Sequence, residues 1–154
     1  LDGYHGNIIA TSDDIAQATS RLSQQVKDDI RFAHERVNKF AQKQRQALID
    51  FEVELSPGLW AGQRQIPVQT AGCYIPGGRY SHVASAIMSV ATAKAAGVKH
   101  VVACSPPKPD AGINDAILYT ANYCGSDTIL ALGGVQGFAA MAFGLLCGQP
   151  AALL

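Results

Sequence analysis

The sequence has no excess charge of either sign, because twelve Lys and Arg balance twelve Asp and Glu over its 154 residues. A neutral chain lacks the broad basic surface that holds the backbone of a nucleic acid, so we expect no nucleic-acid partner. Charge is scarcest in residues 57–154, which hold eight of the twenty-four charges, all seven prolines and thirteen of the fifteen glycines. So few charges solvate a free surface poorly, and we expect either residues 1–56 or further protein to cover this region.

Patterns of secretion and membrane insertion are also missing. Residues 1–6 have neither the basic nor the apolar segment of a signal peptide. Residues 128–154 carry no charge and are long enough to cross a bilayer, but glycines, glutamines and a proline interrupt them. The interruptions favour a buried strand, a turn and a buried helix, so we expect no membrane partner.

The cysteines form no metal-binding or redox pattern. No two are spaced as Cys-x-x-Cys, and none lies near a histidine at zinc-site spacing. Apolar or small residues surround all four, which are Cys73, Cys104, Cys124 and Cys147. We therefore expect buried, reduced thiols and a cytoplasmic location.

Residues 1–50 are predicted to form a helical lead-in. Ser12 is the expected N-cap, because two acidic residues follow it. Apolar residues then recur at steps of three and four from Ile15 to Ala41, Phe40 included, which predicts one buried face opposite a solvated, charged face. Ser23 is a candidate cap that divides this stretch into two helices.

Residues 51–70 are predicted to form a β-hairpin. Phe51 to Leu55 alternate apolar and acidic side chains, the pattern of a half-buried strand. The Ser-Pro-Gly sequence at 56–58 predicts a turn, and residues 59–68 the returning strand. Trp60 is expected to pack within it.

Residues 71–154 alternate short apolar segments with helical segments. The predicted strands are 71–75, 98–104, 128–132 and one beginning at 151–154, and the predicted helices are 83–96, 113–123 and 135–146. This pattern predicts an α/β fold, a Rossmann-like and mostly parallel sheet with helices on both faces. In this interpretation residues 71–154 form a Rossmann-like half-domain, in which a last strand begins at 151–154.

Glycine-rich turns follow two of the predicted strands, at residues 76–78 and 133–137. Such turns bring backbone N–H groups and a helix N-terminus towards a phosphate or another anion. Neither turn matches the G-x-G-x-x-G fingerprint, and no Walker lysine is present. The glycines are equally compatible with tight turns that have no ligand.

Four polar or aromatic residues flank these turns. Gln136 is polar at the start of an apolar helix, where it either bonds the turn backbone or holds a ligand. Tyr74 precedes the first turn as a ligand platform or as packing. Arg79 and His82 bracket the next helix start, where they favour an anionic group or a salt bridge to other protein. No catalytic triad, carboxylate pair or metal-ligand cluster is evident.

Four segments resemble the histidinol dehydrogenase family in order and spacing. They are residues 72–78 (GCYIPGG), 95–99 (AAGVK), 104–107 (CSPP) and 133–144 (GGVQGFAAMAFG). The resemblance implies an internal segment of a longer, NAD-dependent, zinc-containing homodimer that oxidises a primary alcohol to a carboxylate through an aldehyde. It also implies that Tyr74 and Gln136 contact NAD.

The family's zinc ligands and its general acid–base residues match no position here. The resemblance places them downstream of residue 154, so we expect neither a catalytic residue nor a metal ligand in this chain. For the same reason we expect the 154 residues alone to have no dehydrogenase activity.

The sequence Arg-Tyr-Ser-His at 79–82, together with residues 144–151, departs from the histidinol-specific pattern. It is more similar to the branch of the family that oxidises sulfopropanediol. The resemblance implies a small alcohol as substrate, either sulfopropanediol or histidinol, with Arg79 and His82 suited to a sulfonate. The alternative is a non-catalytic fragment that binds a nucleotide or a partner without turnover.

Overall fold

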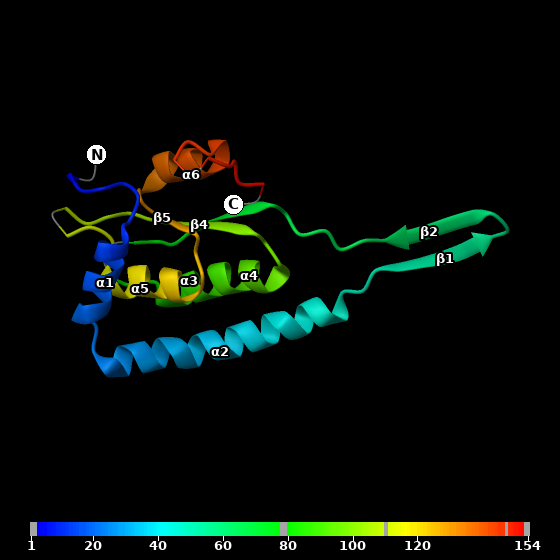
Figure 1. Cartoon of the computed structure of the whole chain (residues 1–154), viewed down its shortest axis with the longest axis horizontal. Helices are drawn as coiled ribbons and strands as arrows, with labels where there is room; N and C mark the ends of the chain where they lie inside the picture. The colour runs from blue at the N-terminus through cyan, green and yellow to red at the C-terminus, as the bar shows by residue number, and fades with distance from the viewer. Residues whose placement is uncertain (1–2, 78–79, 110, 147, 153–154) are drawn as a thin grey trace.

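The structure is a computed structural model that describes residues 3–77, 80–109, 111–146 and 148–152. Helices and sheet are stacked in layers, and a hairpin projects from them (Figure 1). In chain order the elements are α1 (Ser12–Arg21), α2 (Gln24–Ala47), β1 (Phe51–Ser56), β2 (Leu59–Gln63), β3 (Thr70–Tyr74), α3 (Val83–Ala86), the π-helical turn η1 (Ile87–Ala91), α4 (Thr92–Ala96), β4 (His100–Ser105), α5 (Asp115–Tyr123), β5 (Thr128–Ala131) and α6 (Gly134–Phe143).

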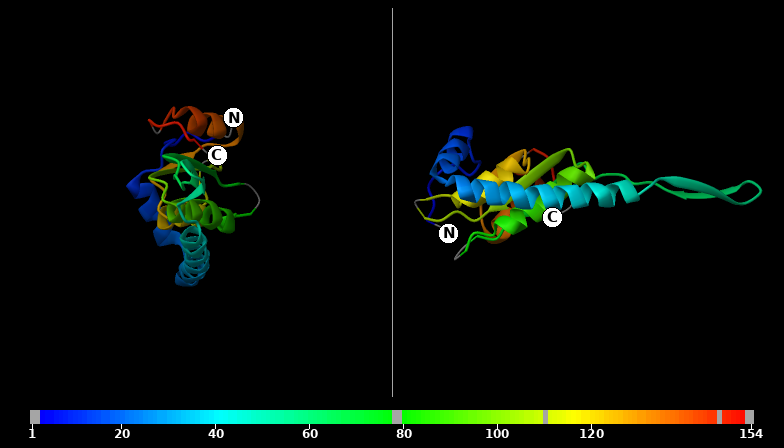
Figure 2. Two further views of the ribbon diagram at one scale, coloured as in Figure 1. Left: turned by 90° about the vertical axis from the view of Figure 1, so that its right-hand side faces the viewer. Right: turned by 90° about the horizontal axis from the view of Figure 1, so that it is seen from below.

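Strands β3, β4 and β5 form a parallel sheet in that order. One face packs against α3, η1 and α5, and the opposite face packs against α6. Figure 2 shows the resulting layers end on, with α2 outermost on the first face. The predicted α/β class, a mostly parallel sheet with helices on both faces, is therefore confirmed.

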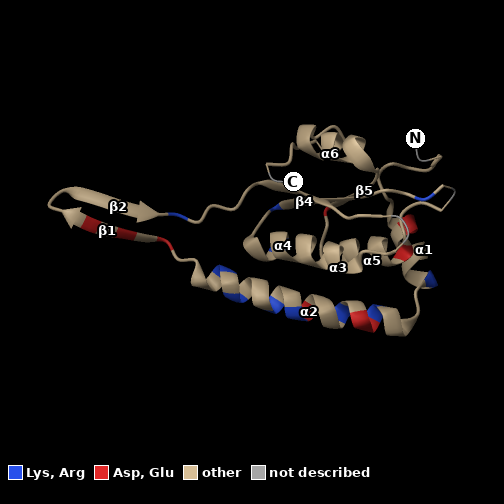
Figure 3. Cartoon of the chain, turned by 180° about the vertical axis from the view of Figure 1, so that it is seen from behind, with Lys and Arg blue, Asp and Glu red and all other residues tan. Residues whose placement is uncertain are grey.

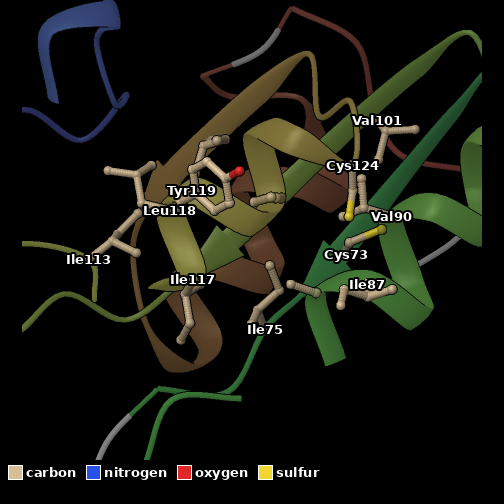
Figure 4. Close-up of a cluster of buried hydrophobic side chains, with 14 of the residues drawn as sticks. Cys73, Ile75, Ile87, Val90, Val101, Ile113, Ile117, Leu118, Tyr119 and Cys124 are labelled. Carbon is tan, nitrogen blue, oxygen red and sulfur yellow. The ribbon is translucent and has the colours of Figure 1, made fainter. Parts of the chain in front are cut away.

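The larger core lies between the sheet and the helices after β3 and β4 (Figure 4). Cys73 and Ile75 point into it from the sheet side, and Ile87 and Ile117 from the helices. The predicted helix 83–96 is one helical segment with a π turn inside it, and it ends at Gly97, whose φ of 92° is left-handed. Arg45 from α2 closes this layer, because its guanidinium donates to the Ala95 carbonyl at 2.9 Å.

The connection after β5 reverses the direction in which the chain adds strands to the sheet. Helices after β3 and β4 lead the chain along one face, whereas α6 crosses back over β4 to β3 on the other face. The Ala152 N–H then donates to the Thr70 carbonyl of β3 at 3.0 Å. Residues 151 and 152 are not in a strand, and residues 153–154 lie outside the described residues. In open α/β sheets such a reversal opens a crevice at the carboxyl ends of the strands.

The N-terminal helices divide where Ser23 predicts, because its hydroxyl accepts from the Val26 N–H at 3.3 Å. Ser12 as N-cap of α1 is wrong. Thr11 is the N-cap, and it exchanges hydrogen bonds with Asp14 in a capping box. The two-way bond with Asp14 outcompetes a cap one residue later, because it satisfies two backbone donors at once.

The predicted apolar face of α2 is only partly buried. Ile30 and Ala41 are buried against the body, but the Phe40 side chain is 66% exposed. Phe40 lies far enough around the helix from Ala41 to point away from α4 and η1. The expectation that Phe40 belongs to the core is therefore wrong.

The predicted hairpin β1–β2 forms, but its second strand ends at Gln63 and not at residue 68, and every residue in its strands is exposed. Trp60 is 60% exposed, so the expectations of a half-buried strand and a packed Trp60 are wrong. Figure 1 shows the reason, since the hairpin extends beyond the end of α2 and away from the sheet. Among the described residues, no helix is long and apolar enough to cross a membrane.

Candidate functional site

The two glycine-rich turns meet at the carboxyl end of the parallel sheet. Tyr74 ends β3 on the face covered by α6, and its hydroxyl accepts a hydrogen bond from the Gly134 N–H at 3.2 Å. Gly134 is the first residue of α6, so this bond joins the β3 turn to the start of that helix. Tyr74 thus lies at the end of β3, the strand at which the order of strand addition reverses, and nucleotides bind at this place in open α/β folds.

Close backbone packing explains the glycines of the second turn. Gly134 has a φ of 56°, which glycine adopts without strain. A Cβ on Gly137 would lie 2.7 Å from the Cys104 Sγ, so α6 approaches β4 too closely for a side chain there. The N-cap residue Gly133 offers no side chain to the helix start. Gly133 and Gly134 therefore leave the backbone at the very start of α6 uncovered by side chains of their own, and the Gly134 N–H is engaged by Tyr74.

Aromatic and amide side chains border this exposed backbone. The rings of Tyr74 and Phe138 stack with centroids 4.7 Å apart and planes 19° apart. Gln136, two residues before Phe138 in α6, is exposed. No side-chain hydrogen bond engages its amide within the part of the chain that is described. Sequence reasoning missed Phe138. Its position as the one aromatic residue in the first five residues of α6, one helical turn after Gly134, was the available signal.

The predicted anion-binding pair is only half visible. His82 is exposed and is the N-cap of α3, where its carbonyl accepts from the N–H groups of Ser85 and Ala86. Arg79 lies outside the described residues, so no geometry between Arg79 and His82 is available and their proposed role stays a prediction. Gly77 lies close to Pro106, because a Cβ there would approach the Pro106 ring to 2.6 Å. This contact brings the β3 turn beside the loop after β4.

The cysteines near the site are buried thiols. Cys73, Cys104 and Cys124 are free and buried, as the sequence predicts, whereas Cys147 lies outside the described residues. Burial raises the pKa of Cys104 to about 11 and that of Cys124 to about 12. Such thiols remain protonated near neutral pH, which makes them poor nucleophiles and poor metal ligands.

No group of three or more His, Cys, Asp or Glu side chains is placed to hold a metal ion within the described ranges. A cluster of charged groups lies at the opposite end of the sheet, where β4 and β5 begin. There Asp127 accepts from the Lys94 ammonium at 2.6 Å and from the Val101 N–H at 2.7 Å. Asp127 thereby accepts the hydrogen bond of a backbone N–H near the start of β4, so its role is structural.

The chain is similar to proteins that are named as dehydrogenases. The family model described as histidinol dehydrogenase matches residues 1–151. The sulfopropanediol 3-dehydrogenase of Ruegeria pomeroyi is 56% identical over 99% of this chain and 35% of its own length. The histidinol dehydrogenase of Parasynechococcus marenigrum is 37% identical over 94% of the chain and 33% of its own length.

A solved structure shows the same fold. The crystal structure of histidinol dehydrogenase from Elizabethkingia anophelis superimposes with a TM-score of 0.86 at 32% identity, over 94% of this chain and 33% of that one. The chain thus spans about a third of the length of the relatives it matches. With a family match over nearly every residue, the chain belongs to the histidinol dehydrogenase family.

Proposed function

We propose that this chain is the cofactor-binding part of an NAD-dependent alcohol dehydrogenase. The observation that carries the proposal is the hydrogen bond from the Gly134 N–H to the Tyr74 hydroxyl, which joins the end of β3, just before the first glycine-rich turn, to the start of α6. Bare backbone at the start of α6 suits a phosphate, and the exposed Gln136 amide suits a ribose hydroxyl or a carboxamide.

The described residues fit a dinucleotide but not a metal. Tyr74 and Gln136 would hold the cofactor against α6, with Phe138 supporting the Tyr74 ring. NAD, when bound, accepts a hydride from the alcohol carbon. The residues of this chain contribute binding, orientation and close packing under the cofactor. No zinc ligand set exists among the described residues, so zinc would require residues elsewhere in a longer protein.

The substrate class follows from the relatives and from the residues after Gly78. We propose oxidation of a small primary alcohol to a carboxylate, with a sulfonated diol of the sulfopropanediol type favoured over histidinol. The identity of 56% to a sulfopropanediol 3-dehydrogenase supports this choice, as does the presence of Arg79 and His82 in the sequence that follows Gly78. A sulfonate is a permanent anion that an arginine binds with two hydrogen bonds.

Titration of NAD by calorimetry tests the cofactor site. Gln136→Ala should weaken NAD binding about 10-fold, because one hydrogen bond to a ligand contributes about 1.4 kcal/mol. Tyr74→Phe removes the bond to Gly134 and should weaken binding by a similar factor. Tyr123→Phe is the matched control, since Tyr123 is 41% exposed on α5. Unchanged affinity in both site variants would refute the proposed site.

Steady-state kinetics of the full-length protein test the substrate. Arg79→Ala should raise the KM for a sulfonated diol at least 10-fold and leave the KM for NAD unchanged. Faster turnover of histidinol, or an unaffected KM in the variant, would overturn the sulfonate assignment. NAD binding without turnover of either alcohol would instead favour the alternative of a non-catalytic nucleotide-binding protein.

A further inference from the structure

The first turn of α6 holds Tyr74 at two points. The Tyr74 hydroxyl oxygen accepts from the Gly134 N–H at 3.2 Å, and the Tyr74 ring stacks on the Phe138 ring with centroids 4.7 Å apart and planes 19° apart. Gly134 and Phe138 are four residues apart, so they lie on the same side of the helix. The phenol therefore lies along the start of α6, with its hydroxyl on the backbone and its ring on a side chain.

Phe138 contributes little to the contact between α6 and the sheet. The residues of α6 that are buried are Gly137, Ala140 and Met141, whereas the Phe138 side chain is 42% exposed. Among the described residues, Phe138 belongs to neither hydrophobic cluster, while Tyr74 packs against the smaller one. The main packing partner of the Phe138 ring is thus the Tyr74 ring.

The bond to Gly134 leaves the proton of the Tyr74 hydroxyl free. A phenol can donate and accept at once, and this one accepts, while no acceptor engages its proton within the described ranges. The Gly134 N–H is an unpaired donor of the helix N-terminus, and its bond to the oxygen makes the phenol O–H a stronger donor. Because a phenol O–H lies in the plane of its ring, the plane of the stacked ring decides where this donor points.

No charged side chain lies on α6, which Figure 3 shows in tan along its length. The groups that border the crevice here, the Tyr74 phenol and the exposed Gln136 amide, are neutral. A hydrogen bond weakens steeply when its angle is poor, whereas the attraction between charges depends on distance alone. Affinity at this site therefore depends on how precisely these two side chains are oriented.

The hydrogen bond alone does not fix the orientation of the Tyr74 ring. At 3.2 Å it is at the long end of the range for N–H···O bonds, and it holds the oxygen but leaves the ring plane free to turn. Ordering a free side chain when a ligand binds lowers the affinity. Two stacked rings prefer a narrow range of relative orientations, so Phe138 orders Tyr74 before the ligand arrives.

We propose that Phe138 is a positioning residue of the cofactor site, which holds the Tyr74 ring so that the free hydroxyl proton faces the crevice. Phe138 does not touch the cofactor and acts through Tyr74. This inference rests on the proposed function, because NAD is the ligand that receives the hydrogen bond from Tyr74.

Hydrogen exchange at the Gly134 amide of the full-length protein tests the contact without any ligand. In Phe138→Ala the phenol moves more freely, so the Gly134 N–H should exchange at least about 3-fold faster, measured by mass spectrometry with single-residue resolution. The Gly137 N–H, which donates to the Gly133 carbonyl at 3.2 Å, is the internal reference and should keep its rate. Phe143→Ala is the matched control, since it removes the same ring from the same helix at a position that is 72% exposed. An unchanged Gly134 rate in Phe138→Ala would refute the positioning role.

Calorimetric titration of NAD into the full-length variants measures the effect on binding. Phe138→Ala should weaken NAD binding about 3- to 10-fold, the loss expected when one side chain must be ordered on binding. Phe138→Leu keeps apolar volume without a flat ring, so it should weaken binding too and serves if the alanine variant does not fold. Phe138→Tyr restores the ring and should recover the affinity. Full affinity in the leucine variant would contradict the proposal, because the flat ring would then be unnecessary.

A double-mutant cycle separates positioning from direct contact with the cofactor. Tyr74→Leu removes the phenol, so adding Phe138→Ala to it should change the NAD affinity by less than about 2-fold. If the two losses multiply instead, Phe138 touches the cofactor itself and is not a positioning residue.

The positioning role and the proposed function can fail separately. Gln136→Ala leaves both rings in place and reports on the cofactor site alone. If Gln136→Ala weakens NAD binding and Phe138→Ala does not, the positioning role is wrong and the site stands. If neither variant weakens NAD binding, while Gly134 exchanges faster in Phe138→Ala, the ring contact exists but the proposed function fails, and this inference fails with it.

Discussion

The two sheets of this protein contain similar apolar residues but differ in how far those residues are buried. Strands β3, β4 and β5 are almost entirely buried, whereas every residue of β1 and β2 is exposed. Both contain apolar side chains suited to strands, such as Leu130 in β5 and Leu55 in β1. The difference arises because helices follow β3, β4 and β5 and fold back over the sheet, while a turn follows β1 and an irregular segment follows β2. Covering a strand depends on the connections, not on the strand's own residues.

Truncation of one leucine in each sheet gives the largest expected contrast. Leu130 is fully buried beneath α6, so Leu130→Ala should lower the free energy of unfolding by about 2–5 kcal/mol. Leu55 is 64% exposed, so Leu55→Ala should change it by less than about 0.5 kcal/mol. Urea unfolding of both variants measures the difference. Equal effects would show that the hairpin is also buried in solution.

Gly137→Ala tests how closely α6 packs on the buried sheet. The added Cβ would lie 2.7 Å from the Cys104 Sγ, and we expect a loss of about 1–3 kcal/mol. Removing that sulfur in the double variant Cys104→Ala, Gly137→Ala should recover most of the loss, so the two effects should not add. Additive effects in urea unfolding would place the clash elsewhere.

Asp127 links the buried sheet to pH. Burial alone would raise its pKa, but hydrogen bonds from the Lys94 ammonium and the Val101 N–H outweigh burial and hold the pKa below the ordinary 3.8. Folding thus favours the carboxylate, so its stabilisation is present above about pH 4 and lost as the pH falls through the folded pKa. Asp127→Ala should cost about 1–2 kcal/mol at about pH 7, discounted for partial exposure. The gap should close as the pH falls below the folded pKa, and a gap independent of pH would contradict this origin.

The buried thiols give the smallest effect on stability and a clear effect on reactivity. Because burial raises the pKa of Cys104 to about 11, its thiolate fraction near pH 8 is about 100-fold lower than at a pKa of 9.0. Alkylation of native protein, located by peptide mass spectrometry, should spare Cys73, Cys104 and Cys124, and denaturation should expose all three. Rapid native labelling of Cys104 would show that α6 opens.

The buried part of the fold was predictable from sequence because each strand there ends at a strong signal. Gly97 stops the helix before β4, and the glycines from Gly133 onwards start α6. These positions fix the alternation of strands and helices, and with it the turns that carry Tyr74 and Gln136. Local chemistry sufficed because those residues lie beside the turns themselves.

What the sequence did not reveal depends on contacts between distant segments. Alternation in Phe51 to Leu55 predicts two different faces, but it cannot say whether anything covers either one. For this reason the prediction that Trp60 packs within the hairpin was wrong. The bond from the Gly134 N–H to the Tyr74 hydroxyl joins positions sixty residues apart, and only the folded sheet brings them together.

The segment before α1 has a consequence for how the sheet can grow. Ile9 bridges antiparallel to Leu130, with the Ala10 N–H donating to the Ile129 carbonyl at 2.9 Å and the Ala131 N–H to the Ile8 carbonyl at 2.7 Å. Residues 8–10 therefore occupy the hydrogen-bonding groups at the outer edge of β5, whereas at the outer edge of β3 the Thr70 carbonyl accepts a hydrogen bond from the Ala152 N–H. A further strand could therefore pair with the sheet beside β3 but not beside β5.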